Sequence, residues 1–343
     1  MVCSISSFSR LPFCLILRYI VPCFFPSGNR HAGKPGEKPF RPFPVDIRPG
    51  VWYTSPTKPH HPKGRLLMNY RLIALDLDGT LLNSRKEIPE ETVRAIRTVC
   101  AAGKTVVFNT GRAVSELTEQ IALLPEVRYA VFASGAGLYD IRERKYFGLH
   151  AIPAHQARRI MSLARTKDVM PQIVLPDADV IQASHMEQLE HFNMGVYRPL
   201  YEKAMTLVPD IHAFAESCRE PVLKLNLYHA DPAERILSRR QLETRELELV
   251  YSEISSLECS AEGVSKGSGL ERLCRLLELP PESCIAVGDA DNDIPMLRSA
   301  GLGVAMGNAP DYVKTAADRI VSDLDHGGCA EAIMLLLHAG SAS

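Results

Sequence analysis

The sequence predicts an α/β protein: a doubly wound parallel sheet forms the core, and a smaller α+β domain is inserted into it. Short apolar runs alternate with helical patterns on both sides of the middle of the chain, as is typical of parallel strands joined by crossover helices. The middle instead shows period-2 alternation, which is typical of an antiparallel sheet. With 343 residues, the chain is long enough for two domains.

The first 67 residues differ in composition from the rest. They hold 11 of the 24 prolines and ten basic against two acidic residues, which leaves 29 basic and 38 acidic residues for the remainder. A basic, proline-rich segment without periodicity does not bury a core, so we expect residues 1–67 to be a largely disordered extension. Its apolar run over residues 11–25 is interrupted by prolines and Arg18, so we do not expect it to span a membrane. A targeting segment and a non-functional extension ahead of a start at Met68 both remain open.

The expected core elements follow from apolar runs and helical spacing. Residues 72–75 are a wholly apolar run, which indicates a buried parallel strand. Val93, Ile96 and Val99 recur at helical spacing before Gly103, which ends the helix. The expected elements are, in order, strand 72–75, a helix from Pro89, strand 105–108, helix 115–124, strand 129–132, a hairpin over 138–148, helix 267–279, strand 285–287, helix 293–300, strand 302–305, a short helix from Pro310, strand 319–321 and a closing helix 328–338.

The middle of the chain shows a different pattern of apolar and polar residues. Leu223, Leu225 and Leu227 alternate with Lys224 and Asn226, which predicts a strand with one apolar and one solvated face. Segment 246–253 alternates in the same way, and a helix over 154–167 would cover the apolar face. We therefore expect an α+β domain at residues 152–257, inserted into a core formed by 68–151 and 258–343.

Charge and cysteine usage exclude some classes of partner. The formal net charge of −1 argues against a dedicated nucleic-acid binder, and we expect no membrane partner. The nine cysteines show neither a CxxC pair nor zinc-type spacing, so a disulfide framework is not expected. This pattern favours a reducing, cytoplasmic location.

Four carboxylates lie just past predicted strands or at the helix start that follows. Asp76 and Asp78 follow the first strand, and Asp289 and Asp293 follow the strand at 285–287. Because the carboxyl ends of parallel strands share one edge, these groups should meet there. Each alone could form a turn or a helix cap, but together they repel unless a cation neutralises them. We therefore expect Mg²⁺, which prefers oxygen ligands and accompanies bound phosphate.

Two further segments could hold an anion. Thr110, Gly111 and Arg112 end the second strand, where a hydroxyl and free N–H groups can bind phosphate, although Thr110 could be an ordinary helix cap. Lys266 stands at a predicted helix start, where a cation is disfavoured. Most lysines there are solvated, but an anion between Lys266 and the helix would account for this position.

These segments, taken in order, resemble the four motifs of the haloacid dehalogenase superfamily. The segments are Asp76-Leu77-Asp78-Gly79-Thr80, Thr110-Gly111-Arg112, Lys266 and Gly288-Asp289-x-x-Asn292-Asp293. More narrowly, the chain resembles Cof-like phosphatases, which carry a large α+β cap between the second and third motifs. The similarity extends from Met68 to the C-terminal helix. It implies a Rossmann-like core and a Mg²⁺-dependent phosphatase acting on a small phosphorylated metabolite, such as a sugar phosphate.

The resemblance also implies roles for individual residues. Asp76 would attack phosphorus and become an aspartyl phosphate, while Asp78 would protonate the leaving oxygen and then activate water. Asp76, the backbone carbonyl of Asp78 and Asp289 would hold Mg²⁺, with Asp293 in support. The groups that would hold phosphate oxygens are the Leu77 N–H, Thr110, Gly111, Lys266 and Asn292.

One departure and two alternatives remain. The family often has Asn-Gly-Ala after the third strand, whereas this chain has Ser134-Gly135-Ala136, so substrate contacts near that loop are uncertain. A phosphomutase on the same scaffold and a non-catalytic module that binds a phosphorylated ligand are the alternative functions. Neither the substrate nor the oligomeric state can be predicted from the sequence.

Overall fold

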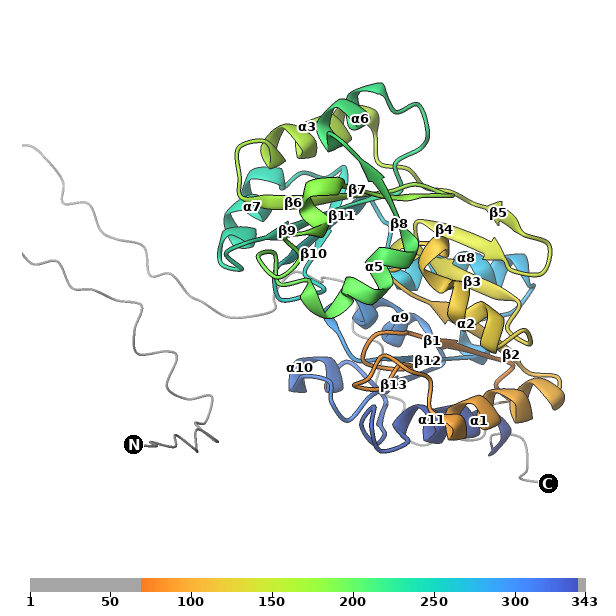
Figure 1. Cartoon of the computed structure of the whole chain (residues 1–343). Helices are drawn as coiled ribbons and strands as arrows, with labels where there is room; N and C mark the ends of the chain where they lie inside the picture. Colours follow the sequence, from red (N-terminus) through yellow and green to blue (C-terminus); the bar gives the residue numbers. More distant parts are fainter. Residues whose placement is uncertain (1–68, 339–343) are drawn as a thin grey trace, which may run out of the picture. The chain divides into compact units, whose positions relative to one another are not determined.

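The computed structural model describes residues 69–338 and contains two β-sheets (Figure 1). The expected extension at residues 1–67 lies outside the described residues. Within residues 69–338, no helix is both long and apolar enough to cross a bilayer.

The first sheet confirms the predicted parallel core. Its eight strands run in the order β14-β13-β12-β1-β2-β3-β4-β5, and the first six are parallel. Their bounds are β1 (Leu72–Leu75), β2 (Thr105–Asn109), β3 (Tyr129–Phe132), β12 (Cys284–Gly288), β13 (Leu302–Ala305) and β14 (Arg319–Ile320). The predicted hairpin is also present, as antiparallel β4 (Gly137–Asp140) and β5 (Lys145–Phe147).

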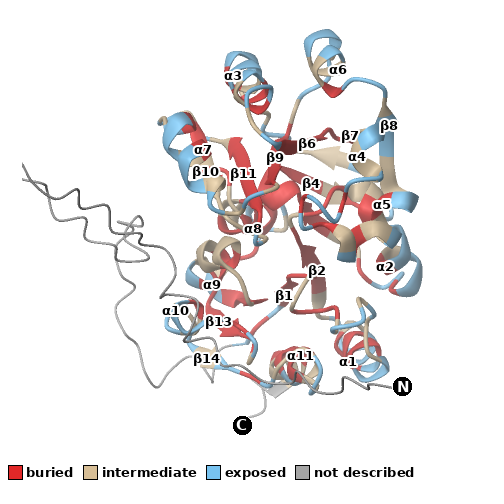
Figure 2. Ribbon diagram, turned by 60° about the vertical axis from the view of Figure 1, so that its left-hand side comes forward, coloured by how far each residue is buried: buried red, intermediate tan, exposed pale blue. Residues whose placement is uncertain are grey.

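Helices cover both faces of this sheet because the buried strands are apolar on both sides. Ile73 and Leu75 of β1 pack in one core with α1 (Glu90–Ala101) and α11 (Gly328–His338). Leu72 and Ala74 pack in another with α8 (Lys266–Leu276) and α9 (Ile294–Ser299). Figure 2 shows the central strands almost entirely buried between these layers. The shorter helices of this part are α2 (Thr118–Leu123) and α10 (Asp311–Lys314).

The second sheet has six strands in the order β10-β11-β9-β6-β7-β8. The bounds are β6 (Val169–Val174), β7 (Asp179–Gln182), β8 (Met205–Val208), β9 (Lys224–His229), β10 (Leu247–Val250) and β11 (Ser256–Ala261). The sheet is antiparallel as predicted, except that β7 and β8 pair in parallel. Its helices are α3 (Ala154–Ala164), α4 (Ala183–Met186), α5 (Arg198–Ala204), α6 (Ile211–Ser217) and α7 (Glu234–Leu242).

The predicted solvated face of β9 is buried. Leu225 and Leu227 pack in a core cluster with residues of α3, α6 and α7, as the alternation predicts. Lys224 and Asn226, on the opposite face, are only 2% and 4% exposed, because this face is turned toward the first sheet and not toward solvent. The sheet also continues through β11 to Ala261, past residue 257, where the inserted domain was expected to end.

The strand order places the sequence motifs side by side. β1 lies between β12 and β2, and Leu75 is in register with Val287 on one side and with Phe108 on the other. The segments that follow these three strands therefore leave the sheet at the same edge.

The start of α8 is fixed by its N-cap. The Ser265 hydroxyl accepts a hydrogen bond from the Ser268 N–H, and the Ser268 hydroxyl in turn accepts one from the Ser265 N–H. The cap determines where the helix begins and thus where Lys266 lies.

Ser265→Ala is expected to lower the free energy of unfolding by about 1 kcal/mol, because one helix N–H loses its acceptor. Urea denaturation measures the change. The control is Ser162→Ala on the exposed side of α3, which removes only a bond to the Arg158 carbonyl and should change stability by less than about 0.5 kcal/mol. Equal effects in both variants would contradict the role of the cap.

Candidate active site

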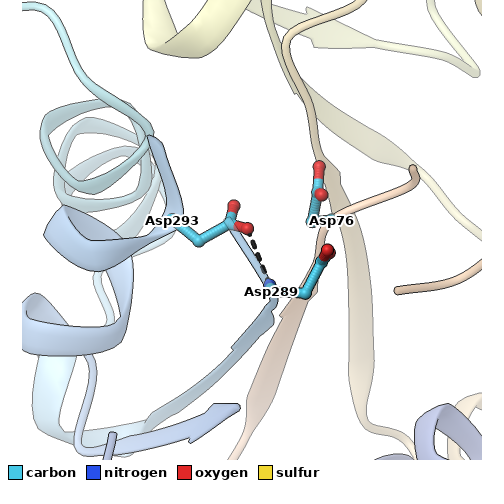
Figure 3. Close-up of side chains that lie close together, drawn as sticks. All are labelled: Asp76, Asp289 and Asp293. Atoms are coloured by element: carbon cyan, nitrogen blue, oxygen red, sulfur yellow. Dashed lines mark hydrogen bonds between the residues drawn. The ribbon is translucent and has the colours of Figure 1, made fainter. Parts of the chain in front are cut away.

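Three carboxylates meet at the carboxyl ends of β1 and β12. Asp76 follows β1, Asp289 follows β12, and Asp293 lies just before α9. Figure 3 shows the three side chains directed toward one another, and one oxygen of each lies within 4.8 Å of the others. The sequence prediction that two stretches about 200 residues apart bring acidic groups together is thus confirmed.

Lys266 lies between two of these carboxylates. Its Nζ donates to Asp76 Oδ1 and to Asp293 Oδ1, both at 2.6 Å, and its side chain is 1% exposed. Although burial lowers the pKa of Lys266, the two carboxylates outweigh it and raise this pKa above its usual value. The anions that account for a lysine at this helix start are therefore carboxylates of the site itself.

Hydrogen bonds to both carboxylate oxygens hold the Asp293 side chain in place. Oδ2 accepts hydrogen bonds from the backbone N–H groups of Asp289 (Figure 3) and Ala290, and Oδ1 accepts from Lys266. Asp293 therefore holds the turn after β12 in place, which suits a supporting role more than direct coordination of a cation.

Asp289 is held close to the turn that follows β1. Its Oδ1 accepts a hydrogen bond from the Thr80 hydroxyl at 2.8 Å. Gly79 permits this approach, because its φ of +86° favours glycine and an added Cβ would lie 2.2 Å from Asp289 Oδ2. Burial, and secondly the charge of Asp293, raises the pKa of Asp289 to about 7.

The charges of this cluster are unbalanced within the chain. Burial and the charge of Asp293 also raise the pKa of Asp76, although Lys266 opposes them. One lysine thus faces three carboxylates, two buried and that of Asp289 partly buried, and a hard divalent cation with oxygen ligands would offset the remaining negative charge. Asp76 and Asp289 fit such an ion, since Asp76 Oδ1 accepts a single hydrogen bond from the described residues, that of Lys266, and Asp289 Oδ2 accepts none of 3.2 Å or shorter.

Asp78 does not point into this cluster but forms ion pairs with two cations. Arg112 donates to both of its oxygens, at 2.8 and 2.9 Å, and Lys86 Nζ donates to Oδ1 at 2.8 Å. Although burial raises the pKa of Asp78, Arg112 and then Lys86 lower it to about 2. Only the backbone carbonyl of Asp78 is thus left for a cation, as the resemblance implies.

Arg112 and Lys86 were not among the predicted site residues. Arg112 belongs to the Thr110-Gly111-Arg112 motif, so its place in the sequence was a usable signal. Lys86 lies in an irregular loop and has a φ of +61°, which no sequence pattern indicates. Each sheet together with its helices is called a sheet unit below. Lys86 also contacts the second sheet unit, through the ring and hydroxyl of Tyr197.

Four of the five predicted phosphate-binding residues line one cavity with Asp76 and Asp78. These four are Thr110, Gly111, Lys266 and Asn292. The fifth, Leu77, directs its fully buried side chain into the core, so only its backbone could face a phosphate. The Thr110 hydroxyl accepts a hydrogen bond from the Arg112 N–H, which shapes the loop after β2.

Ser134, the departure from the family pattern, takes part in a buried contact between the two sheet units. Its hydroxyl donates to Glu258 of β11 at 2.7 Å, and Lys224 of β9 donates both to Ser134 Oγ and to Glu258. Lys224 also donates to the Gly111 carbonyl at 2.6 Å. The alternation that predicted the strand around Lys224 gave no indication of this network, since the contacts with Ser134 and Gly111 cross between the two sheets.

Comparisons with known proteins agree with this geometry. The model of the haloacid dehalogenase-like hydrolase family matches residues 73–333. Phosphatase YwpJ of Bacillus subtilis is 30% identical over 285 residues, covering 78% of this chain and all of that protein. Pyridoxal phosphate phosphatase YbhA of Escherichia coli is 28% identical over 262 residues, covering 75% and 94%. A haloacid dehalogenase-like hydrolase structure from B. subtilis superposes with a TM-score of 0.70 at 27% identity, covering 77% and 98%.

The fold and the clustered carboxylates define a hydrolase whose site lies at the carboxyl edge of a parallel sheet. The chain belongs to the haloacid dehalogenase-like hydrolases, in their Cof-like branch, and its enzyme class is that of hydrolases acting on phosphoric monoesters.

Gly79→Ala is expected to abolish Mg²⁺ binding, since its Cβ would displace the Asp289 carboxylate. The matched control is Gly103→Ala, because Gly103 has a similar φ of +77° but open space around an added Cβ. Both variants should lose about 1–2 kcal/mol from the left-handed backbone alone. Melting temperatures with and without Mg²⁺ separate the two effects: Mg²⁺ should stabilise Gly103→Ala but not Gly79→Ala. Equal stabilisation of both would contradict the placement of Asp289.

Proposed function

We propose that this protein is a Mg²⁺-dependent phosphatase that hydrolyses small phosphorylated metabolites through a phosphoenzyme at Asp76. The observation that carries the proposal is the contact of Lys266 with Asp76 and Asp293, with Asp289 beside them, at one end of a cavity. A module that merely binds a ligand has no need of a nucleophile, an acid–base group and a cluster of carboxylates around a lysine together.

Asp76 would act as the nucleophile. Lys266 donates to its Oδ1, which keeps a lone pair for the cation, and Oδ2 would attack phosphorus while the bond from phosphorus to the leaving oxygen breaks. The leaving oxygen takes a proton from Asp78. Water then attacks the aspartyl phosphate and gives a proton to Asp78, the bond between phosphorus and Asp76 breaks, and inorganic phosphate leaves.

Asp78 has the ionisation state of a base in this structure. With a pKa of about 2 beside Arg112 and Lys86, it is ionised at neutral pH and suited to accept a proton from water. To serve as the acid in the first step, Asp78 must carry a proton, which requires weaker contact with one of the two cations.

Asp76, Asp289 and the carbonyl of Asp78 would hold Mg²⁺, which supplies positive charge opposite the phosphate oxygens when bound. Lys266, Thr110, Gly111 and Asn292 line the same cavity and would bind the remaining oxygens. The fit of the carboxylate pair to a divalent cation supports this assignment.

The inserted unit, which runs from residue 152 through the end of β11 at Ala261, would act as a cap over a catalytic core formed by the segments before and after it. The cavity is lined from both sheet units and has a volume of about 300 Å³, which supports a small substrate shielded from water. The six cysteines in the described part of the chain are all free, in keeping with a reducing, cytosolic location.

Asp76→Asn is expected to lower the turnover of p-nitrophenyl phosphate by at least ~10³-fold, because the amide is a poor nucleophile but retains an acceptor for Lys266. Removal of Mg²⁺ from the unsubstituted protein should have a comparable effect. Asp168→Ala, at an exposed ion pair with His191, is the control and should keep full activity. An Asp76→Asn variant that folds and retains the parent turnover rate would refute the assignment of Asp76 as the nucleophile.

A further inference from the structure

The two sheet units are connected by two short segments, residues 148–153 between β5 and α3 and residues 262–265 between β11 and α8. Each segment holds a glycine with positive φ, Gly148 at +57° and Gly263 at +70°. An added Cβ would meet no atom closer than 3.9 Å at either position, so neither glycine is clamped by its surroundings. Because glycine is conformationally permissive, the side-chain contacts between the units govern how firmly they hold together.

One of these contacts joins two carboxyl groups. Asp179 of β7, in the second sheet unit, is fully buried, and Glu116, in the helical turn Val114–Leu117 after β2, is 7% exposed. The Asp179 carboxyl lies within hydrogen-bonding reach of the Glu116 carboxyl. The units also meet at the next helix, where Lys203 of α5 forms an ion pair with Glu119 of α2 at 2.6 Å. The carboxyl pair is thus part of the packing between the two units.

The pair can form a hydrogen bond only if one carboxyl carries a proton. Asp179 Oδ2 accepts from Gln172 Nε2 at 2.8 Å, and Glu116 Oε2 accepts from the Ala113 N–H at 2.7 Å. Asp179 Oδ1 is buried and accepts no hydrogen bond from any residue in 69–338. Oδ1 is therefore the oxygen left to carry a proton, and a protonated Asp179 donates that proton toward Glu116.

The positive charges near the pair are engaged elsewhere. Within residues 69–338, neither carboxyl forms an ion pair with a lysine or an arginine. Arg112 forms its ion pair with Asp78, although its charge also interacts with Glu116. Lys224 forms its ion pair with Glu258 of β11. Burial raises the pKa of both neighbouring tyrosines, which stay neutral. The titratable groups that face the pair are Arg112 after β2, Tyr201 of α5, and Lys224 and Tyr228 of β9.

The ionisation of Asp179 responds to this placement. Burial, and then the charge of Glu116, raises the pKa of Asp179 well above its usual value. A carboxyl exposed to water has its ordinary pKa, so the pKa stays raised only while the units are in contact. Bringing the units together thus takes up a proton. The contact is strongest at low pH, and it weakens as the pH rises from the ordinary pKa toward the raised one.

We propose that Asp179 and Glu116 form a pH-sensitive latch between the two sheet units, which is closed while the carboxyls share a proton and is released when that proton is lost. Among the described residues, neither carboxyl forms a hydrogen bond with Asp76 or Asp289. Glu116 does line the cavity. The latch therefore controls access to the cavity and not the chemistry within it, and it does not depend on the proposed phosphatase function.

Hydrogen exchange measured by mass spectrometry tests the latch. Peptides covering residues 110–117 and 194–204 report on the two sides of the contact. Their exchange rates, divided by the intrinsic rate at each pH, give the open fraction. For the unsubstituted protein, we expect this fraction to rise by at least ~5-fold from pH 5 to pH 8, because the loss of one proton shifts an equilibrium by up to ~10-fold per pH unit.

Two substitutions test the assigned residues. Asp179→Asn and Glu116→Gln each remove one charge at nearly the same volume and supply an amide N–H to the remaining carboxylate, so the open fraction should no longer change with pH. The control, Glu119→Gln, removes the exposed ion pair with Lys203 between the same two units and should keep the pH dependence. The pKa of Asp289, about 7, is not altered by these substitutions, so Asp289 does not account for a difference among the variants.

Each outcome decides for or against the latch. A rise in the open fraction with pH that is lost in Asp179→Asn or in Glu116→Gln supports it. A constant open fraction between pH 5 and pH 8 in the unsubstituted protein overturns it, and this measurement requires no substitution. A rise that persists in every folded variant of the pair also overturns it, because another group must then bind the proton.

Discussion

The buried ammonium group of Lys266, held between Asp76 and Asp293, is the contact on which the geometry of the site depends. A cation at a helix start opposes the helix dipole, and a cation out of water is unfavourable, so Lys266 requires anions at short range. Asp76 and Asp293 supply them. In return, Lys266 fixes Asp76 Oδ1 and aligns the segments after β1 and β12. Lys266 does not neutralise all of the negative charge of Asp289 and Asp76. The remaining negative charge favours the binding of a divalent cation at the site.

Much of the fold and the acidic half of the site could be predicted from the sequence. Wholly apolar runs such as residues 72–75 indicate buried parallel strands, and parallel strands bring Asp76, Asp289 and Thr110 to one edge irrespective of their distance along the chain. The position of Lys266 at a helix start indicated a nearby anion, because a cation is unfavourable there without one.

The contacts between the two sheet units could not be predicted. The alternation in β9 indicates which residues share a face, but not what that face packs against, so Lys224 and Asn226 were expected in solvent and are buried. The partners of Lys224 on the side of the first sheet, Ser134 and Gly111, are 90 and 113 residues away in the sequence. Periodicity carries no information on such contacts, which depend on how the two sheets pack against each other.

Calorimetric titration of Mg²⁺ near pH 7, in two buffers with different heats of ionisation, tests the charge balance most directly. Because burial and neighbouring carboxylates raise the pKa of Asp289 to about 7 and also raise that of Asp76, a bound cation must displace protons from them. We predict one Mg²⁺ site per chain, with net proton release that diminishes as the pH rises above 8. Tight Mg²⁺ binding without proton release, at an affinity that does not change between pH 6 and pH 8, would contradict the account.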